Sequence, residues 1–336
     1  MEEKINLAIV GCGGMANAHA SGINAEPLAQ VVALCDVNRA NMERLRDKFP
    51  NKESIKLYDS YEALLKNPPE KLRGIMFVTP HTQHFQQAMS AIEHGYDVLV
   101  EKPMVTNSDH ARKLAEKLKA TGRQLQVGFQ APFSAEFAYI RDVLKNNGLG
   151  ELQTITAFSC QGWRNGTLNS WRQDPAMSGG GQMYDTGAHL FNSVAWLIDR
   201  PAEEVFCWTD KKGTPVDINA AITIRFQGNV LGTVTISGNT PGWQEGIWLA
   251  GDKGRIVTGI HAARLEHYDE KGALIKYPQV TQKGYTPIGN FVQCIAGKAE
   301  PRCGVRYGVL HSWLMDALYQ SDREGRPVKL SAPPLD

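Results

Sequence analysis

The chain has 336 residues, enough for about two domains, and its 42% apolar and 21% charged residues are ordinary for a folded globular protein. Its formal net charge of +1, without a basic cluster, gives no support for nucleic acid or an anionic membrane surface as a partner. No stretch of about 18 apolar residues is present to span a bilayer.

The first residues of the chain and the spacing of the cysteines bear on the cellular compartment of the protein. Two acidic residues precede the first apolar run, whereas a secretory signal needs a basic start and an apolar segment. The six cysteines are scattered and include no Cys-x-x-Cys pair, which argues against a zinc site and a disulfide framework. We therefore expect a cytoplasmic protein with reduced thiols.

The first third of the chain alternates short apolar runs with helical patterns. The runs are continuous rather than alternating, which is typical of strands that are buried on both faces of a parallel sheet. Expected strands are 5–10, 31–36, 74–79, 96–101 and 124–129. Expected helices are 14–25, 38–48, 60–66, 82–94 and 108–121. This order predicts a doubly wound α/β domain over residues 1–128.

The pattern changes in residues 129–336, for which we predict an α+β domain with an open, mostly antiparallel sheet. Directly successive strands separated by turn residues indicate antiparallel pairing. Expected strands are 152–162, 205–210, 218–226, 230–239, 245–251, 254–260, 264–269 and 273–278. Expected helices are 185–198, 286–297 and 305–323, and residues 165–182 are expected to form a loop rich in Gly, Asn, Ser and Trp.

The segment GCGGMA directly follows the first expected strand. It fits the G-x-G-x-x-G/A pattern, in which Gly11 allows a tight turn, Gly13 lets a pyrophosphate approach the backbone and Ala16 allows close packing. Asp36 ends the second expected strand, where a carboxylate accepts ribose hydroxyls and repels a 2′-phosphate. The cofactor is therefore expected to be NAD, with NADP less favoured, although Arg39 is a counter-signal. The alternative is a glycine turn with an incidental aspartate.

A further loop, VTPHTQH, follows the strand at 74–79, at the edge that faces the ligand crevice. Thr79 and Pro80 are expected to shape a wall beside the ribose or nicotinamide. His84 either contacts the cofactor or begins the next helix with its ring bonded to the backbone. His81, in the same loop, is a further candidate for contact with the cofactor.

The segment VEKPM places two charges at the end of a buried strand. Lys102 lies at the crevice edge, where an ammonium donates hydrogen bonds, or acts as a base if its pKa is lowered. Glu101 is expected to point toward the cofactor or the domain edge, and Pro103 to restrict the backbone. Read alone, the segment fits a solvated strand end equally well.

A second group of polar residues lies in SGGGQMYDTGAH. Three glycines at 179–181 allow a close backbone approach. Asp185 and His189 are four residues apart, which places both on one face of a helix, where a histidine suits proton transfer. The alternative is an N-capping aspartate followed by a core histidine. No third ligand is suggested by spacing, so we expect no metal.

Two tryptophan–arginine pairs, at 163–164 and 171–172, precede this segment. Their aromatic faces and guanidinium groups are suited to hold a sugar or a cofactor phosphate. No Gly-x-Ser-x-Gly elbow is present to indicate a serine hydrolase.

Taken together, these motifs and the last helical segment resemble the Gfo/Idh/MocA oxidoreductases along essentially the whole chain. The resemblance implies a Rossmann domain followed by an open-sheet domain that supports homodimers or homotetramers, and a small-molecule sugar, sugar derivative or cyclitol as substrate. Lys102 and His189 match the catalytic lysine and histidine, and Asp185 matches the assisting acid. Cofactor-contacting positions are matched by Gly11, Gly13, Gly14, Met15, Asp36, Val78, Thr79, Pro80, His81, His84, Glu101, Lys102, Gln130, Trp171 and Arg172. The expected substrate-binding residues are Lys102, Gln130, Trp163, Arg164, Arg172, Asp185 and His189.

One departure from the family pattern bears on the substrate. Where many members carry asparagine and arginine after the sixth strand, this chain has Gln130 followed by Ala131-Pro132. Because this arginine is missing, we do not expect the protein to bind a substrate through a carboxylate or phosphate group. A neutral polyol or glycoside fits better.

Three functions are compatible with these residues. The first is hydride transfer between a secondary hydroxyl and NAD, with one of Lys102 and His189 as the base and the other stabilising the alkoxide. The second is glycoside cleavage by transient oxidation, elimination, hydration and re-reduction. The third is a non-catalytic dinucleotide-binding regulator, but such relatives typically lose the lysine or histidine that this chain keeps.

Overall fold

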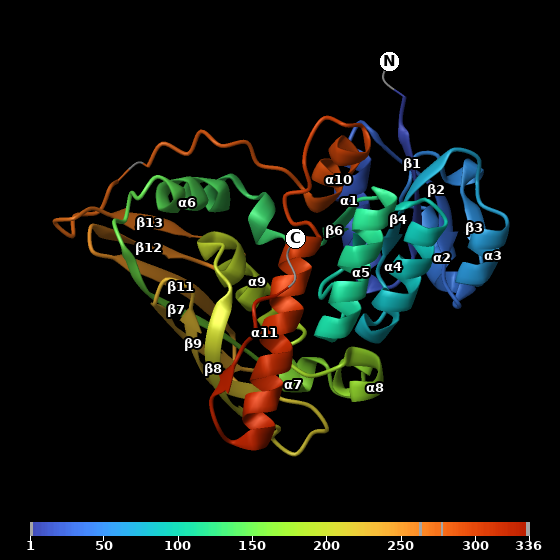
Figure 1. Cartoon of the computed structure of the whole chain (residues 1–336). Helices are drawn as coiled ribbons and strands as arrows, with labels where there is room; N and C mark the ends of the chain where they lie inside the picture. Colours follow the sequence, from blue (N-terminus) through green and yellow to red (C-terminus); the bar gives the residue numbers. More distant parts are fainter. Residues whose placement is uncertain (1–2, 262–263, 277, 334–336) are drawn as a thin grey trace.

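The computed structural model describes residues 3–261, 264–276 and 278–333, which form two units with one sheet each (Figure 1). In the first unit, the sheet has the parallel order β3-β2-β1-β4-β5-β6, which confirms the predicted doubly wound domain. Its strands are β1 (Ile5–Val10), β2 (Ala29–Cys35), β3 (Lys56–Tyr58), β4 (Leu72–Phe77), β5 (Asp97–Val100) and β6 (Leu125–Val127). Its helices are α1 (Gly14–Ala25), α2 (Arg39–Arg46), α3 (Tyr61–Lys66), α4 (His84–Glu93) and α5 (Ser108–Thr121), with the 3₁₀ turns η1 (Lys52–Ser54) and η2 (His81–Gln83).

Helices cover both faces of this sheet, which explains its continuous apolar strands. On one face, Leu7 and Ile9 of β1 pack in a cluster with α1 and α2. On the other face, Ala8 and Val10 pack in a cluster with α4 and α5. All four side chains are buried because both faces of the strand are covered.

The second unit contains an eight-stranded sheet in the order β13-β12-β11-β7-β10-β9-β8-β14 among the described residues. All its pairs are antiparallel except β7 with β10, so the expected mostly antiparallel sheet is confirmed. Its strands are β7 (Leu152–Gln161), β8 (Ala202–Asp210), β9 (Asn219–Phe226), β10 (Val230–Ser237), β11 (Trp243–Gly251), β12 (Gly254–Thr258), β13 (Leu265–Tyr268) and β14 (Val328–Lys329). Its helical segments are η3 (Ala131–Phe133), α6 (Ala135–Lys145), α7 (Trp163–Gly166), η4 (Trp171–Gln173), α8 (Pro175–Ser178), α9 (Thr186–Ile198), α10 (Pro287–Ile295) and α11 (Val305–Glu324).

Several elements differ from the expected ones. The short strand β3 and the helix α6 were not expected, and the loop at 165–182 contains short helical turns. Residues 273–276 form no strand and contribute one isolated bridge, between Tyr268 and Leu274, while Tyr277 lies outside the described residues. Ser134 caps α6 by accepting a hydrogen bond from the backbone N–H of Phe137, a local signal that was available in the sequence.

The end of the chain connects the two units. Helix α10 contributes Ile288, Phe291 and Val292 to the core around β1 of the first unit. Helix α11 contacts both α5 of the first unit and β8 of the second, and it lies between the two units in Figure 1. These contacts join the two units.

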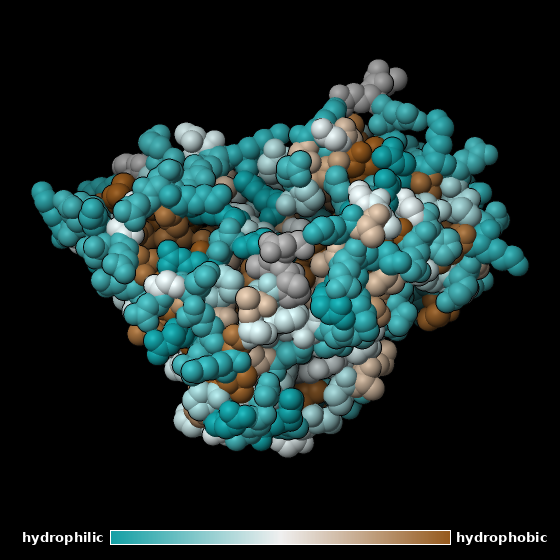
Figure 2. Space-filling model, in the orientation of Figure 1, coloured by the Kyte–Doolittle hydropathy of each residue, from teal (hydrophilic) through white to brown (hydrophobic). Residues whose placement is uncertain are grey.

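Among the described residues, no helix is long and apolar enough to cross a membrane. The face shown in Figure 2 is largely hydrophilic, with hydrophobic residues in scattered groups.

Candidate active site

Asp185 is the meeting point of three hydrogen-bond donors from separate segments. Lys102 follows β5, and its Nζ lies 2.6 Å from Asp185 Oδ1 and 3.1 Å from the Asp185 carbonyl oxygen. The other carboxylate oxygen accepts the indole N–H of Trp163 at 2.7 Å and the Arg172 Nε–H at 3.0 Å. Residues predicted from VEKPM, from both Trp–Arg pairs and from the glycine-rich segment therefore occupy one site.

The charge of this cluster is fixed by its surroundings. Burial alone would raise the pKa of Asp185, but the nearby positive charges of Lys102 and Arg172 hold that pKa well below its ordinary value. Asp185 is thus a carboxylate at every ordinary pH. It positions Lys102, whose ammonium group donates two of its three N–H groups to Asp185. The third N–H can donate to an oxygen of a ligand.

The expectation that Asp185 and His189 share one helix face is wrong. Helix α9 begins at Thr186, and Asp185 precedes it with φ −92° and ψ −93°, so the four-residue spacing does not apply. The Asp185 carboxylate is taken by Lys102, Trp163 and Arg172 rather than by His189. Asp185 is placed by the turn before α9, whereas His189 is placed by α9 itself.

His189 is paired with no described residue through a hydrogen bond, and its ring is half-buried. Its ring packs edge-on against Phe129, with centroids 5.8 Å apart. Burial lowers the pKa of His189 well below its ordinary value, and the nearby charge of Lys102 lowers it further. His189 is therefore a neutral imidazole whose nitrogens are available to a ligand.

A second histidine, not expected from the sequence, lies beside His189. The ring of His261 is 4.9 Å from that of His189, and its Nδ1 is 2.7 Å from Glu245 Oε2. The half-exposed ring of Trp243 is 5.7 Å from His261. No local signal was available, because Glu245 and His261 are 16 residues apart and only the β11–β12 pairing brings them together.

The glycine-rich loop has the geometry that a dinucleotide needs. Gly11 has φ +90°, and a Cβ there would lie 2.6 Å from the carbonyl oxygen of Val78, so only glycine fits. At Gly13 and Gly14 a Cβ would meet no atom within 4 Å, which leaves room for a ligand against the backbone. No side chain caps the start of α1, so its N–H groups and positive dipole end are open to phosphate.

Asp36 lies directly after β2, beside this loop. Its carboxylate accepts the backbone N–H of Cys12 at 2.6 Å and that of Asn38 at 2.8 Å. Arg39, the residue that would favour a 2′-phosphate, is exposed and pairs with Glu43 at 3.2 Å. A carboxylate at the ribose position, with the nearby arginine directed to another acid, fits NAD.

The VTPHTQH loop contacts the second unit through His81 and Thr82, which bond to backbone oxygens of residues 176–178. His84 is fully buried, with Nδ1 2.8 Å from the carbonyl oxygen of Pro103 and Nε2 2.9 Å from that of Thr79. His81 bonds to the carbonyl oxygen of Ser178 at 3.0 Å, and its ring lies 4.8 Å from that of Trp171. The ring of His84 thus connects this loop to the loop that carries Lys102.

Glu101 points to the α1 side of the sheet. Its Oε1 lies 2.6 Å from His19 Nε2, a partner one helical turn beyond the glycine loop that sequence reasoning missed. Both residues line a cavity of about 340 Å³ together with Gln130 and Tyr285. The exposed Gln130 side chain is accordingly placed beside Glu101, as expected for residues at the ends of neighbouring strands β5 and β6.

The three consecutive glycines allow close approach of other protein atoms. A Cβ at Gly181 would lie 2.1 Å from the backbone oxygen of Asp217, and one at Gly180 would meet Tyr319 and Tyr184. The fully buried Asp217 carboxylate accepts the N–H groups of Gly181 and Met183, both at 2.8 Å. This packing fixes the turn that presents Asp185.

The remaining predicted residues lie around the same loops. Arg164 is half-buried beside Trp163, and its backbone N–H donates to Gly238. Met15 is exposed in the first turn of α1, and the Arg172 guanidinium lies 4.6 Å from the centre of the Trp171 ring. No three His, Cys, Asp or Glu side chains in the described part of the chain converge to hold a metal ion.

Comparison with known proteins identifies the family of the chain. Residues 5–129 match the model of an oxidoreductase family with an NAD-binding Rossmann fold, and residues 137–257 match the GFO/IDH/MocA C-terminal domain. D-glucoside 3-dehydrogenase of Escherichia coli is 23% identical over 354 residues, covering 97% of this chain and 97% of that protein. Inositol 2-dehydrogenase of Rubrobacter xylanophilus is 23% identical over 264 residues, covering 76% of this chain and 71% of that protein.

The fold is also shared with solved structures. The WlbA dehydrogenase from Bordetella pertussis, solved with NADH and UDP-GlcNAcA, superposes with a TM-score of 0.83 at 21% identity, covering 98% of this chain and 100% of that chain. The two family models match parts of both units, from β1 into β12. The chain belongs to the Gfo/Idh/MocA family of oxidoreductases, which bind NAD through a Rossmann domain.

Proposed function

We propose that this protein transfers a hydride between NAD(H) and a secondary hydroxyl of a neutral sugar, sugar derivative or cyclitol. The observation that carries the proposal is the Lys102–Asp185 ion pair together with His189, whose pKa is lowered and which has no hydrogen-bond partner among the described residues. Named relatives act on glucosides and on inositol, which are both polyols with secondary hydroxyls.

The cofactor site follows from the loop geometry. Gly11, Gly13, Gly14 and the start of α1 hold the pyrophosphate, and Asp36 holds the ribose hydroxyls. When bound, NAD supplies the hydride chemistry, and the protein supplies placement and proton management. We assign further cofactor contacts to Met15, Val78, Thr79, Pro80, His81, Glu101, Gln130, Trp171 and Arg172.

His84 has a different role in this proposal. Both of its ring nitrogens lie within 2.9 Å of backbone carbonyl oxygens, the N–H of the neutral ring donates to one of them, and the ring is fully buried. It holds the Thr79 loop and the Pro103 loop together, so it positions cofactor-contacting residues rather than touching the cofactor.

The two catalytic side chains have separate tasks. Lys102, held by Asp185, donates its remaining N–H to the reacting oxygen and stabilises the negative charge that develops there. His189 accepts the hydroxyl proton during oxidation and returns it during reduction. His261 and Trp243 lie beside His189 and are placed to contact a neighbouring hydroxyl and a sugar face.

The pH dependence of oxidation tests the assignment of His189. A base must be unprotonated, and a lowered pKa keeps His189 unprotonated at more acidic pH. The ordinary pKa of histidine is about 6.5. We therefore expect kcat/KM for hydroxyl oxidation to fall on acidification only below that pH. Measurement of kcat/KM for hydroxyl oxidation across pH checks this, and a limb above pH 6.5 would contradict the assignment.

A substrate panel tests the function as a whole. Polyols, cyclitols and glycosides are incubated with NAD and with NADP, and both NADH and released aglycone are followed. Stoichiometric NADH from a polyol or cyclitol is the expected result. Aglycone release without net NADH would instead favour glycoside cleavage through transient oxidation, and absence of both would favour a regulatory dinucleotide-binding protein.

The outer face of the second sheet bears on assembly. Phe158, Trp208, Leu231 and Trp248 are exposed there, opposite the face that α9 and α11 cover. We propose that a second copy of the chain covers this face, giving a homodimer or homotetramer. Light scattering of the purified protein measures the subunit number.

A further inference from the structure

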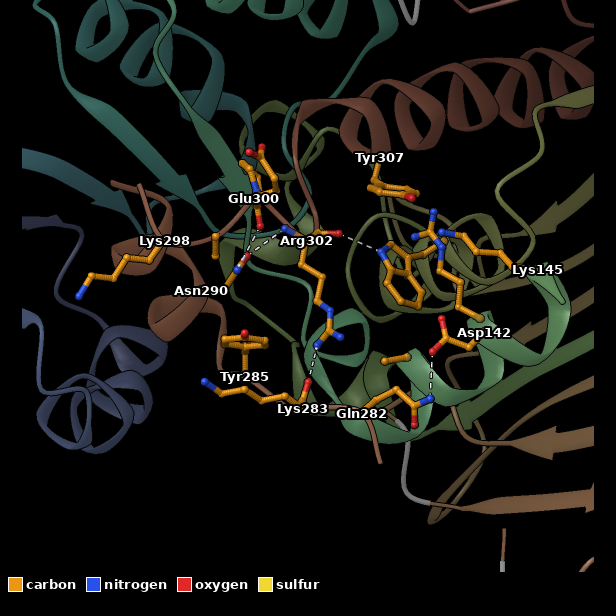
Figure 3. A pocket seen from close by; sticks show the side chains of 15 residues that line it. Asp142, Lys145, Gln282, Lys283, Tyr285, Asn290, Lys298, Glu300, Arg302 and Tyr307 are labelled. Carbon is orange, nitrogen blue, oxygen red and sulfur yellow. Dashed lines mark hydrogen bonds between the residues drawn. The ribbon is translucent and has the colours of Figure 1, made fainter. Parts of the chain in front are cut away.

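A cavity of about 680 Å³ opens between α6 and the segment that flanks α10 (Figure 3). Its lining includes none of the residues that meet at Asp185 or at the glycine-rich loop. The lining joins residues of the second unit, such as Arg141 and Trp196, to the 282–302 segment, whose helix packs on the first unit. The cavity thus lies where the end of the chain bridges the two units.

Positive side chains dominate this cavity. Arg141, Lys145, Lys283, Lys298 and Arg302 line it, whereas its carboxylates are Asp142 and Glu300. Asp142 already accepts a hydrogen bond from the side chain of Gln282 at 2.9 Å. A concentration of one sign of charge in a concave site attracts ions of the opposite sign.

The charge of Arg302 has no carboxylate partner among the described residues. Its side chain is half-buried, and its Nη1 donates to the carbonyl oxygens of Phe133 and Lys283, both at 3.2 Å. In the described part of the chain, no carboxylate forms an ion pair with Arg302, Lys145 or Lys283. Burial also lowers the pKa of Arg302, which shows that its charge is partly desolvated.

The cations are held in place before any ligand arrives. The guanidinium of Arg302 and the ammonium of Lys283 lie 5.4 Å and 4.9 Å from the centre of the Tyr285 ring. The Arg302 backbone is fixed by Asn290 and Trp196, each bonded to it at 2.9 Å. Figure 3 shows the Arg302 side chain directed toward Lys283. Such preorganisation lowers the entropic cost of binding an anion.

The opposite wall is aromatic and rigid. The Arg141 guanidinium lies 4.4 Å from the centre of the Trp196 ring and 5.5 Å from that of Tyr307, and it pairs with Asp199 at 2.7 Å. Aromatic faces suit the organic part of a ligand, and a planar guanidinium suits paired oxygens of a phosphate or carboxylate.

From these observations we propose that this cavity is a binding site for a small organic polyanion, either a phosphate ester or a polycarboxylate. Arg302 and Lys283 bind its oxyanion group, and Lys145 adds a second positive contact. Tyr285 lines both this cavity and the one beside Glu101, so the bound anion contacts the wall that the two cavities share. The site is independent of the hydride-transfer residues.

Calorimetric titration of inorganic phosphate and of citrate tests the site. The protein is saturated with NAD, so that the pyrophosphate position is filled, and chloride keeps the ionic strength constant. We expect saturable binding of at least one anion, and the stronger of the two identifies the oxyanion class. Arg302→Gln should raise Kd at least about 10-fold, and Lys283→Gln at least about 3-fold, because each removes a direct charge contact.

The matched control is Arg323→Gln, which removes an exposed arginine at the end of α11 and should leave Kd unchanged. Because Arg302 also bonds to two backbone carbonyls, its variant is compared with Lys283→Gln and Lys145→Gln, whose ammonium groups are not part of the core. Unchanged Kd values in both lysine variants, or no saturable binding above the chloride background, would overturn the proposal.

Discussion

Replacing Lys102 with methionine is expected to lower kcat at least about 100-fold while NAD binding is retained, the scale that removal of a proton-handling or oxyanion-stabilising group usually produces. Methionine keeps most of the apolar stem of the side chain but removes the ammonium group, whose N–H faces the reacting oxygen. Asp185 keeps its bonds to Trp163 and Arg172, so the turn that presents it should remain in place. Steady-state kinetics and NAD titration by fluorescence measure the two quantities.

The control for this variant is Lys119→Met, on the exposed side of α5. It removes the same charge from the protein but touches no residue of the site, so kcat should not change. A kcat of Lys102→Met within a few-fold of that of the unmodified protein would show that Lys102 does not act on the reacting oxygen.

Replacing Asp185 with asparagine is expected to reduce both stability and activity. Three donors, from Lys102, Trp163 and Arg172, meet this buried carboxylate. Asparagine keeps the shape, but its NH₂ group must then face a donor, and two partly buried cations lose their counter-charge. The expected cost is about 3–5 kcal/mol of unfolding free energy, together with a fall in kcat of at least about 100-fold, because Lys102 loses its position.

Urea denaturation and steady-state kinetics measure these two effects. Asp210→Asn is the matched control, because Asp210 is exposed and its removal should change neither quantity. Arg172→Gln removes only one of the three donors and should give a smaller loss of stability. Unchanged stability of Asp185→Asn would mean that the three donors find other partners and that Asp185 does not organise the site.

The sequence was sufficient for the features that depend on local chain chemistry. Gly11 and Gly13 identified the cofactor loop because a turn with positive φ and a close backbone approach each require glycine. The apolar runs identified β1, β2, β4, β5 and β6 because strands covered on both faces lack polar alternation. Lys102 was found because a charge at the end of a buried strand lies at the ligand edge of a parallel sheet.

Weak or misleading local signals account for what was missed in the fold. Strand β3 is only three residues long, with one buried side chain, so it carries no recognisable period. The four-residue spacing of Asp185 and His189 suggested a shared helix face, yet α9 begins one residue too late for that. Sequence spacing has meaning only inside a regular element, and Asp185 lies outside one.

Only the tertiary structure decided which residues act together. The ion pair between Lys102 and Asp185 joins positions 83 residues apart, and Glu245 orients His261 beside His189 only because β11 pairs with β12 and α9 packs against β7. The sequence by itself determined the glycine-rich loop and most elements of the two units, and it supplied the side chains to which we assign the reaction, since each depends on neighbouring residues. The partners of those side chains depend on distances across the folded chain, which no local pattern records.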